Sequence, residues 1–131
     1  MAEIQKPPGV LVVEDEEVIR NMVVSLCERN GYRTFPAGDG IEALEIIAEH
    51  EKDILVAILD IAMPRMTGTE LYREMILSNS KIPVIVASGF LVDKDEIIQQ
   101  TGGTPYAIFS KPYALNDLLD KINEIRDRED S

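Results

Sequence analysis

Apolar residues recur along this chain in two alternating patterns. Short, mostly aliphatic runs occupy positions 10–13, 54–59, 84–87 and 107–110, and each run stops at a polar residue. The longer segments between them repeat an apolar residue every three or four positions, which is the period of an amphipathic helix. Short runs that alternate with helices indicate repeated strand–helix units. We therefore predict an α/β fold, a three-layer sandwich in which helices cover both faces of a parallel sheet.

Turn and capping residues set the bounds of the predicted elements. Gly31 ends the first helix, and the pairs Asp39 with Glu42 and Thr67 with Glu70 have the spacing of a capping box. We expect helices at 16–30, 39–50, 67–76, 93–102 and 115–125, and strands at 10–13, 32–35, 54–59, 84–87 and 107–110. The buried face of the first helix is expected to hold Val18, Ile19, Met22, Val23, Leu26 and Cys27.

The length of the chain suits a single domain. Its 131 residues can bury one core and are too few for two domains of ordinary size. Residues 1–9 contain a Lys-Pro-Pro-Gly segment that cannot continue a helix, so we predict a flexible leader there. The domain itself is expected to run from 10 to 126, and residues 127–131 are expected to fray.

Composition narrows the possible partners and the compartment. The chain has 24 acidic and 13 basic residues and a net charge of -11, which opposes direct contact with nucleic acid or an anionic membrane. Cys27 is the single cysteine, so no internal disulfide can form, and a reducing compartment is natural. The apolar run at 54–59 is far shorter than the ~18 residues of a membrane span. We therefore expect a cytoplasmic protein.

Candidate functional residues stand where the predicted strands end. Glu14 and Asp15 follow the first run, Asp60 follows the run at 54–59, Ser88 follows the run at 84–87, and Lys111 follows the last one. Ligand sites in open α/β sheets lie at the carboxyl ends of the strands. The acids, the hydroxyl and the ammonium group are therefore expected to form one site.

The charges of this site indicate a divalent cation. The carboxylates of Glu14, Asp15 and Asp60 together with one ammonium group leave two negative charges, and oxygen ligands favour Mg²⁺ or Mn²⁺. Because Mg²⁺ keeps water or phosphate oxygens in its shell, a phosphoryl group has room to bind. Asp60 is then the candidate nucleophile, with Lys111 and Ser88 binding phosphoryl oxygens.

Four stretches at these strand ends resemble the motifs of two-component response-regulator receiver domains, such as the chemotaxis regulators. The similarity covers about residues 10–126, nearly the whole chain. It implies a flavodoxin-like, doubly wound sheet of five strands in the order 2-1-3-4-5 with five helices. The four stretches are Val10-Leu11-Val12-Val13-Glu14-Asp15-Glu16, Leu59-Asp60-Ile61-Ala62-Met63-Pro64-Arg65-Met66-Thr67-Gly68, Ala87-Ser88-Gly89 and Ser110-Lys111-Pro112.

The resemblance also implies a metal site with divided roles. Asp60 is expected to accept the phosphoryl group, Asp15 to bind Mg²⁺ directly, and Glu14 to act on the metal largely through water. Ala62 is expected to contribute its backbone carbonyl oxygen to the metal.

Switching and partners follow from the same resemblance. Ser88 takes the position of a switch hydroxyl, and Lys111 precedes Pro112 in an expected cis peptide. A sensor histidine kinase or a histidine phosphotransfer protein is expected to supply the phosphoryl group, and a downstream effector protein to receive the signal. The fourth helix, fifth strand and fifth helix are the expected output face. The protein is expected to be a monomer or a weak, phosphorylation-dependent dimer.

Some positions depart from the family pattern. The acid usual at position 67 is replaced by Thr67, and the aromatic residue usual three positions before the lysine is replaced by Ile108, while Tyr106 lies five positions before it. Ala62 and Gly89 are both small. Because similar receivers use bulk at those two positions as a shield, we expect an acyl phosphate that is open to hydrolysis.

Three other functions compete with a phosphorylated switch. A phosphohydrolase with an aspartyl nucleophile needs a second acid two residues later, and that residue is Ala62. A flavodoxin-like nucleotide binder needs a phosphate loop after the first strand, where Glu14, Asp15 and Glu16 repel phosphate. A docking module that is never phosphorylated remains open. We expect a signalling switch that catalyses only its own phosphoryl transfer and dephosphorylation.

Overall fold

Five parallel strands form one sheet in the order β2-β1-β3-β4-β5. The computed structural model describes residues 6–61, 66–89 and 93–129. The strands are β1 (Gly9–Val13), β2 (Arg33–Ala37), β3 (Ile54–Asp60), β4 (Val84–Ser88) and β5 (Ala107–Ser110). The helices are α1 (Glu17–Arg29), α2 (Gly40–His50), α3 (Gly68–Leu77), α4 (Lys94–Thr101) and α5 (Leu115–Glu129), with a short 3₁₀ turn at Glu51–Asp53. The predicted fold class and strand order are confirmed.

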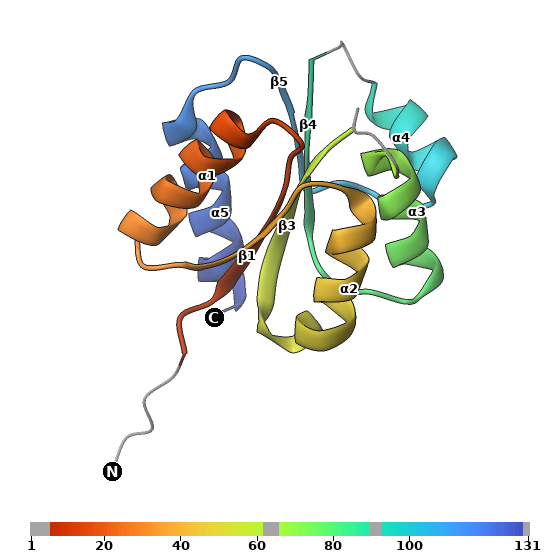
Figure 1. Cartoon of the computed structure of the whole chain (residues 1–131). Coiled ribbons are helices and arrows are strands. Elements are labelled where there is room, and N and C mark those ends of the chain that lie inside the picture. The colour runs from red at the N-terminus through yellow and green to blue at the C-terminus, as the bar shows by residue number, and fades with distance from the viewer. Residues whose placement is uncertain (1–5, 62–65, 90–92, 130–131) are drawn as a thin grey trace.

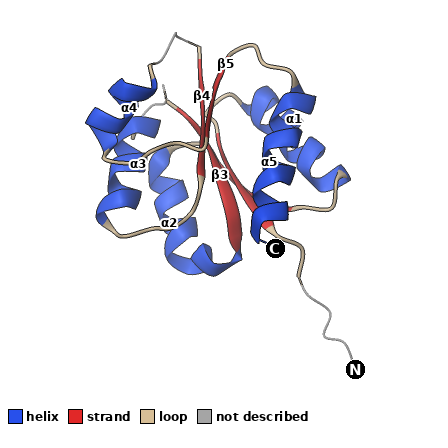
Figure 2. Cartoon of the chain, turned by 180° about the vertical axis from the view of Figure 1, so that it is seen from behind, coloured by secondary structure: helices blue, strands red, loops and turns tan. Residues whose placement is uncertain are grey.

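The helices form a layer on each face of the sheet. Helices α1 and α5 cover one face, and α2, α3 and α4 cover the other (Figures 1 and 2). Alternate residues of β1 point to opposite faces, so Val10 and Val12 pack against α1 and α5 while Leu11 and Val13 pack toward α2 and α3. The central strands are therefore apolar except where β3 ends at Asp60 and β4 ends at Ser88.

Helix ends follow the expected capping chemistry in most places. Thr67 and Glu70 form the predicted reciprocal capping box at the start of α3. Asp39 caps α2 by accepting from the amide of Glu42 at 2.9 Å, but the Glu42 carboxylate accepts from the amide of Gly38 instead of completing the box. Gly31 follows α1 with a φ of +88°, a left-handed conformation that suits glycine.

The first helix buries a narrower stripe than predicted. Val18 is 73% exposed and Met22 is 48% exposed, although both were expected on the buried face. Val23, Leu26 and Cys27 are the residues of α1 that are buried. A helix on a sheet buries only the stripe that faces the strands, and residues four apart such as Val18 and Met22 share a different stripe.

The ends of the domain also differ from expectation. Strand β1 begins at Gly9, inside the expected leader, and α5 continues to Glu129 where fraying was expected from Asp127. Arg126 lies over the ring of Tyr32 at 5.7 Å and Arg128 over the ring of Tyr106 at 5.5 Å. These contacts hold the last turn of α5 against the rest of the domain. No helix in the described ranges has the length and apolar character to cross a membrane.

Gly68 lets α3 begin directly against the end of β3. Its amide donates to the carbonyl of Ile61 at 2.9 Å. A Cβ atom at this position would lie 2.1 Å from the carbonyl oxygen of Asp60, which is backbone and cannot rotate away. Glycine is required here because the two chain segments approach too closely for a side chain.

We predict that Gly68→Ala destabilises the domain, because the new methyl group must push the start of α3 away from Asp60. The expected loss is about 1–3 kcal/mol of unfolding free energy, as for overpacked cores. Urea unfolding measures it, with Gly89→Ala as the control, since a Cβ there meets no atom of the described residues within 4 Å. Equal stability of the two variants would contradict this account of Gly68.

Candidate functional site

Three carboxylates meet at the carboxyl edge of the sheet. Glu14 and Asp15 follow β1, and Asp60 ends β3; one oxygen from each lies within 4.8 Å of the others. The strands β1 and β3 are neighbours with Val13 opposite Leu59, so the next residue on each strand reaches the same edge. Strand β1 lies between β2 and β3, which makes this edge the topological switch point of the sheet.

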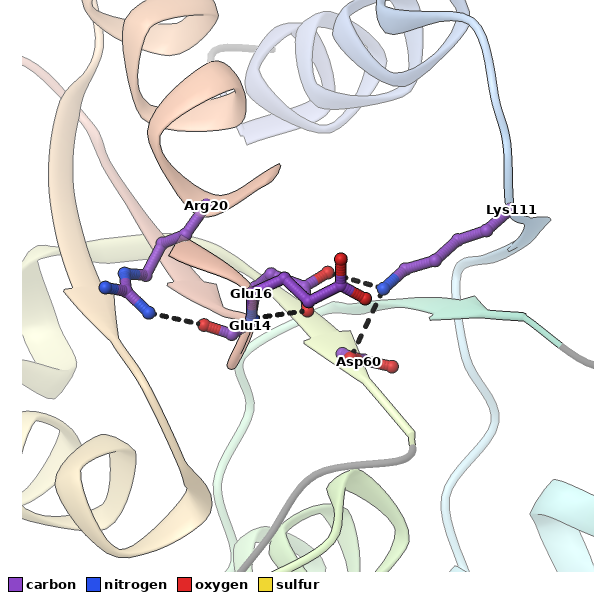
Figure 3. A network of polar contacts seen from close by, with 5 residues as sticks. All are labelled: Glu14, Glu16, Arg20, Asp60 and Lys111. Carbon is purple, nitrogen blue, oxygen red and sulfur yellow. Dashed lines mark hydrogen bonds and ion pairs between the residues drawn. The ribbon is translucent and has the colours of Figure 1, made fainter. Parts of the chain in front are cut away.

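Lys111 reaches this cluster from β5, across the intervening strand β4. Its Nζ atom lies 2.6 Å from Oε1 of Glu14 and 3.3 Å from Oδ2 of Asp60 (Figure 3). Glu14 and Asp60 are only 4% and 5% exposed. The positive charge of Lys111 therefore offsets the negative charges of two nearly buried acids. The peptide bond between Lys111 and Pro112 is cis, as expected.

Glu14 is held by several further contacts. Its other carboxylate oxygen accepts from the amide of Glu16 at 3.2 Å, and its carbonyl oxygen accepts from Nη1 of Arg20 at 2.8 Å (Figure 3). Its amide donates to the carbonyl of Ala37 at 3.0 Å. Asp15, by contrast, is exposed. The cluster therefore has two fixed, buried acids and one acid that faces solvent.

Ser88 is the last residue of β4 and is 1% exposed. Asp60 pairs with Ala87 in the sheet, so Ser88 lies one residue beyond Asp60 on the neighbouring strand. The carbonyl of Ser88 accepts from the amide of Lys111 at 2.7 Å, which ties the ends of β4 and β5 together. Ala62, the expected source of a metal-binding carbonyl, lies outside the described residues.

Burial and the neighbouring acid change the protonation of Asp60. Desolvation, followed by the hydrogen bond with Glu14 and the charge of Glu14, raises the pKa of Asp60 from 3.8 to about 7, although Lys111 opposes the rise. Burial alone would lower the pKa of Lys111, but its contacts with Glu14 and Asp60 outweigh burial, so its pKa is raised. Lys111 stays charged, whereas Asp60 in the metal-free site holds its proton to a higher pH than an ordinary aspartate.

The donor set fits a hard divalent cation. The ligand atoms are all carboxylate oxygens, and the carboxylates outnumber the one ammonium group that contacts them. Oxygen-only sites of this kind favour Mg²⁺ over zinc or copper. The exposed side of Asp15 leaves a path from solvent. The site is therefore an acidic pocket compatible with Mg²⁺ and with phosphorylation.

A groove adjoins the acidic pocket. It has a volume of about 410 Å³ and lies between the first turns of α1 and the segment that joins β5 to α5. Its lining is mainly apolar and includes one residue of the acidic pocket, Lys111. The lining residues are Glu16, Ile19, Met22, Val23, Lys111, Pro112, Tyr113 and Leu115.

Arg20 is a site-adjacent residue that the sequence did not single out. It lies in the first turn of α1, six positions after Glu14. Its side chain points back to the loop before the helix and donates to the carbonyl of Glu14. In the sequence, an arginine on the polar side of an amphipathic helix looks like any solvated residue. Its position relative to the two preceding acids is the one available signal.

The order of the strands and the acidic pocket at the switch point define a flavodoxin-like α/β domain of the receiver type. The family model of the response regulator receiver domain matches residues 10–123. The chain therefore belongs to the response regulator receiver domain family, and it is a receiver domain of two-component signalling, a signalling switch.

Curated relatives and solved structures agree with this assignment. Response regulator MprA of Mycobacterium sp. (strain KMS) is 31% identical over 122 residues, which is 91% of this chain and 50% of the relative. MprA of Mycobacterium ulcerans is 33% identical over 119 residues, 88% of this chain and 49% of the relative. The chain thus spans about half the length of these relatives.

Two solved structures have the same fold and moderate identity. The receiver domain of the Francisella response regulator 1452 has a TM-score of 0.83 and 28% identity, covering 93% of this chain and 98% of that one. The chemotaxis protein CheY4 of Vibrio cholerae has a TM-score of 0.79 and 27% identity, covering 91% and 98%. Both similarities extend over nearly the whole domain.

The raised pKa of Asp60 predicts a pH-dependent stability without metal. The pKa moves from 3.8 to about 7, so between these values the folded state binds more protons than the unfolded state. Stability from this group is therefore lost as pH rises through that window. Asp60→Asn removes the loss, and at pH 8 we expect it to be more stable than wild type by about 2 kcal/mol.

Urea unfolding of both proteins in EDTA at pH 5 and pH 8 measures this effect. Titratable groups distant from Asp60 contribute equally to both proteins and cancel in the difference between them. The advantage of the Asn variant is expected to be larger at pH 8 than at pH 5. A difference that does not change with pH would contradict the raised pKa.

Proposed function

We propose that Asp60 accepts a phosphoryl group from the phosphohistidine of a sensor histidine kinase or a histidine phosphotransfer protein. The observation that carries this proposal is the approach of Lys111 to both Glu14 and Asp60, in a pocket where three carboxylates lie within 4.8 Å. A buried nucleophile, a fixed cation and room for a divalent metal are the groups that phosphoryl transfer to a carboxylate requires.

Phosphoryl transfer requires Asp60 in its ionised form, because the carboxylate oxygen is the nucleophile. An oxygen of Asp60 forms a bond to phosphorus while the bond from phosphorus to the donor imidazole nitrogen breaks and leaves its electron pair on that nitrogen. Lys111 then binds a phosphoryl oxygen with the ammonium group that now contacts Asp60 at 3.3 Å. The hydroxyl of Ser88 donates a hydrogen bond to another phosphoryl oxygen and senses the modification.

Mg²⁺, or Mn²⁺ in its place, is the proposed cofactor. Asp15 and Asp60 bind the metal directly, Glu14 acts on it largely through water, and the carbonyl of Ala62 completes the protein ligands. When bound, the metal neutralises negative charge as the phosphoryl donor approaches the acids. The exposed carboxylate of Asp15 and the excess of acids over ammonium in the pocket support this assignment.

The modified domain acts on a downstream effector protein. Phosphorylation adds negative charge at Asp60 and biases the domain between two conformations, as a signalling switch and not as a turnover enzyme. The half-buried residues of the edge strand β5 support an output face made of α4, β5 and α5. We propose a monomer or a weak dimer that forms on phosphorylation.

Intact-mass measurement tests the phosphoacceptor. Wild-type protein incubated with acetyl phosphate and Mg²⁺ is expected to gain one phosphoryl group, while Asp60→Asn and a sample in EDTA gain none. Glu45→Gln, an exposed change on α2, is the matched control and keeps the adduct. An adduct retained by Asp60→Asn, or none in wild type with any phosphodonor, would overturn the proposal and favour a docking module.

The apolar groove beside the pocket supports docking of the phosphodonor protein there. Asp60 is 5% exposed, so a phosphohistidine must enter the pocket and its protein must cover the rim. That rim includes the groove and the exposed residues Met22 and Val18 of α1. The exposed acids Glu16 and Glu17 border it. The partner surface is therefore apolar and flanked by basic residues.

Met22→Lys is expected to slow transfer from the donor protein because it places a charge in the apolar contact. A histidine kinase chosen from a panel for its fastest transfer to wild type provides the assay, and we expect a decrease of about tenfold. The rate with acetyl phosphate is expected to stay unchanged. Leu77→Lys is the matched control, because Leu77 is 70% exposed at the far end of α3. Equal slowing by both variants would contradict docking at the groove.

A further inference from the structure

Arg20 fixes the peptide that carries Asp15. Its Nη1 atom donates to the carbonyl oxygen of Glu14 at 2.8 Å (Figure 3). That carbonyl belongs to the peptide group between Glu14 and Asp15, so the contact sets the plane from which Asp15 leaves the chain. The amide of Arg20 itself donates to the carbonyl of Glu16 at 2.9 Å, so the arginine projects from a backbone already locked into α1.

The Asp15 side chain has little else to hold it. It is exposed, and the described part of the chain offers its carboxylate no hydrogen bond or ion pair. The other two acids are in contact with Lys111. Two like charges about 4 Å apart repel by about 1 kcal/mol in water and by more near a protein surface. Without a fixed loop, Asp15 would turn away from the cluster.

The guanidinium group is well placed for this task because it is itself confined. A Cβ atom on Gly38 would lie 3.5 Å from Nη1 of Arg20 and 3.7 Å from Oε2 of Glu42. The same Glu42 oxygen accepts from the amide of Gly38 at 2.8 Å. Nη1 of Arg20 therefore lies beside the turn before α2 while it donates to the loop after β1.

We propose that Arg20 is a positioning residue that holds Asp15 in the orientation a divalent cation requires. It touches neither the phosphoryl group nor the metal and acts through the backbone carbonyl of Glu14. Its positive charge also lies behind the acidic loop, where it offsets part of the repulsion among the acids. The inference rests on the proposed Mg²⁺ site and adds a residue that sets the affinity of that site.

Replacement of Arg20 by methionine keeps the unbranched stem and removes the donors. We expect Arg20→Met to weaken Mg²⁺ binding about tenfold in calorimetric titration, the lower range for residues that orient metal ligands. Arg20→Lys keeps the charge with a single donor group and is expected to recover part of the affinity. Arg29→Met is the matched control, since Arg29 lies at the other end of α1 and donates to the carbonyl of Ser25 at 3.3 Å, away from the acidic pocket.

A kinetic readout separates positioning from a general structural effect. With acetyl phosphate as donor, Arg20→Met is expected to need about tenfold more Mg²⁺ for half-maximal phosphorylation and to reach the wild-type rate at saturating Mg²⁺. Its melting temperature in EDTA is expected to match that of Arg29→Met. This combination would not arise if Arg20 only stabilised the fold.

The outcomes distinguish this inference from the proposed function. Wild-type protein that binds Mg²⁺ together with an Arg20→Met variant of equal affinity overturns the role of Arg20 and leaves the phosphoacceptor proposal standing. A lower affinity that accompanies an equally lowered melting temperature in EDTA also overturns it. Wild-type protein that binds no Mg²⁺ and gains no phosphoryl group overturns both.

Discussion

The repulsion among three carboxylates at one edge of the sheet is the constraint on which the rest of the site depends. Two of these acids are nearly buried, and a buried charge is costly unless it is paired. The ammonium group of Lys111 makes the arrangement tolerable because it contacts both Glu14 and Asp60. A charge that must stay close to two acids on two strands also fixes how the ends of β1, β3 and β5 are arranged.

The fold restricts where the ammonium group of Lys111 can lie. The order β2-β1-β3-β4-β5 puts Lys111 two strands away from Asp60, so its long side chain spans the end of β4. The amide of Lys111 donates to the carbonyl of Ser88, which fixes the height at which the side chain leaves β5. Gly68 packs against the carbonyl of Asp60 from the opposite side. The acid is thus confined by backbone as well as by charge.

Much of this arrangement could be predicted from local signals. Runs such as 54–59 identify buried parallel strands, Thr67 with Glu70 identifies a helix start, and the placement of Asp60 and Lys111 after such runs identifies the edge of the sheet. The strand order came from family resemblance, because periodicity says which segments are strands and not which are neighbours.

The features that the sequence missed depend on three-dimensional proximity. An apolar residue on a helix is buried only if neighbouring elements pack closely over it, and Val18 and Met22 are left 73% and 48% exposed. The last turn of α5 persists because Arg126 and Arg128 find aromatic rings from distant segments. Arg20 adjoins the site through a contact with the Glu14 carbonyl that no local pattern in the sequence indicates.

The unequal contacts of Lys111 bear on how a phosphorylated site would communicate. Its Nζ atom is closer to Glu14, at 2.6 Å, than to Asp60, at 3.3 Å, so in the unmodified domain its charge is shared between these two acids. A phosphoryl group on Asp60 would bring more negative charge to one side of that shared contact and draw Lys111 toward it. Because the amide of Lys111 is bonded to the carbonyl of Ser88, such a movement reaches the end of β4 directly. The proposed coupling between Asp60 and the hydroxyl of Ser88 therefore has a backbone route that involves no aromatic residue at the position of Ile108.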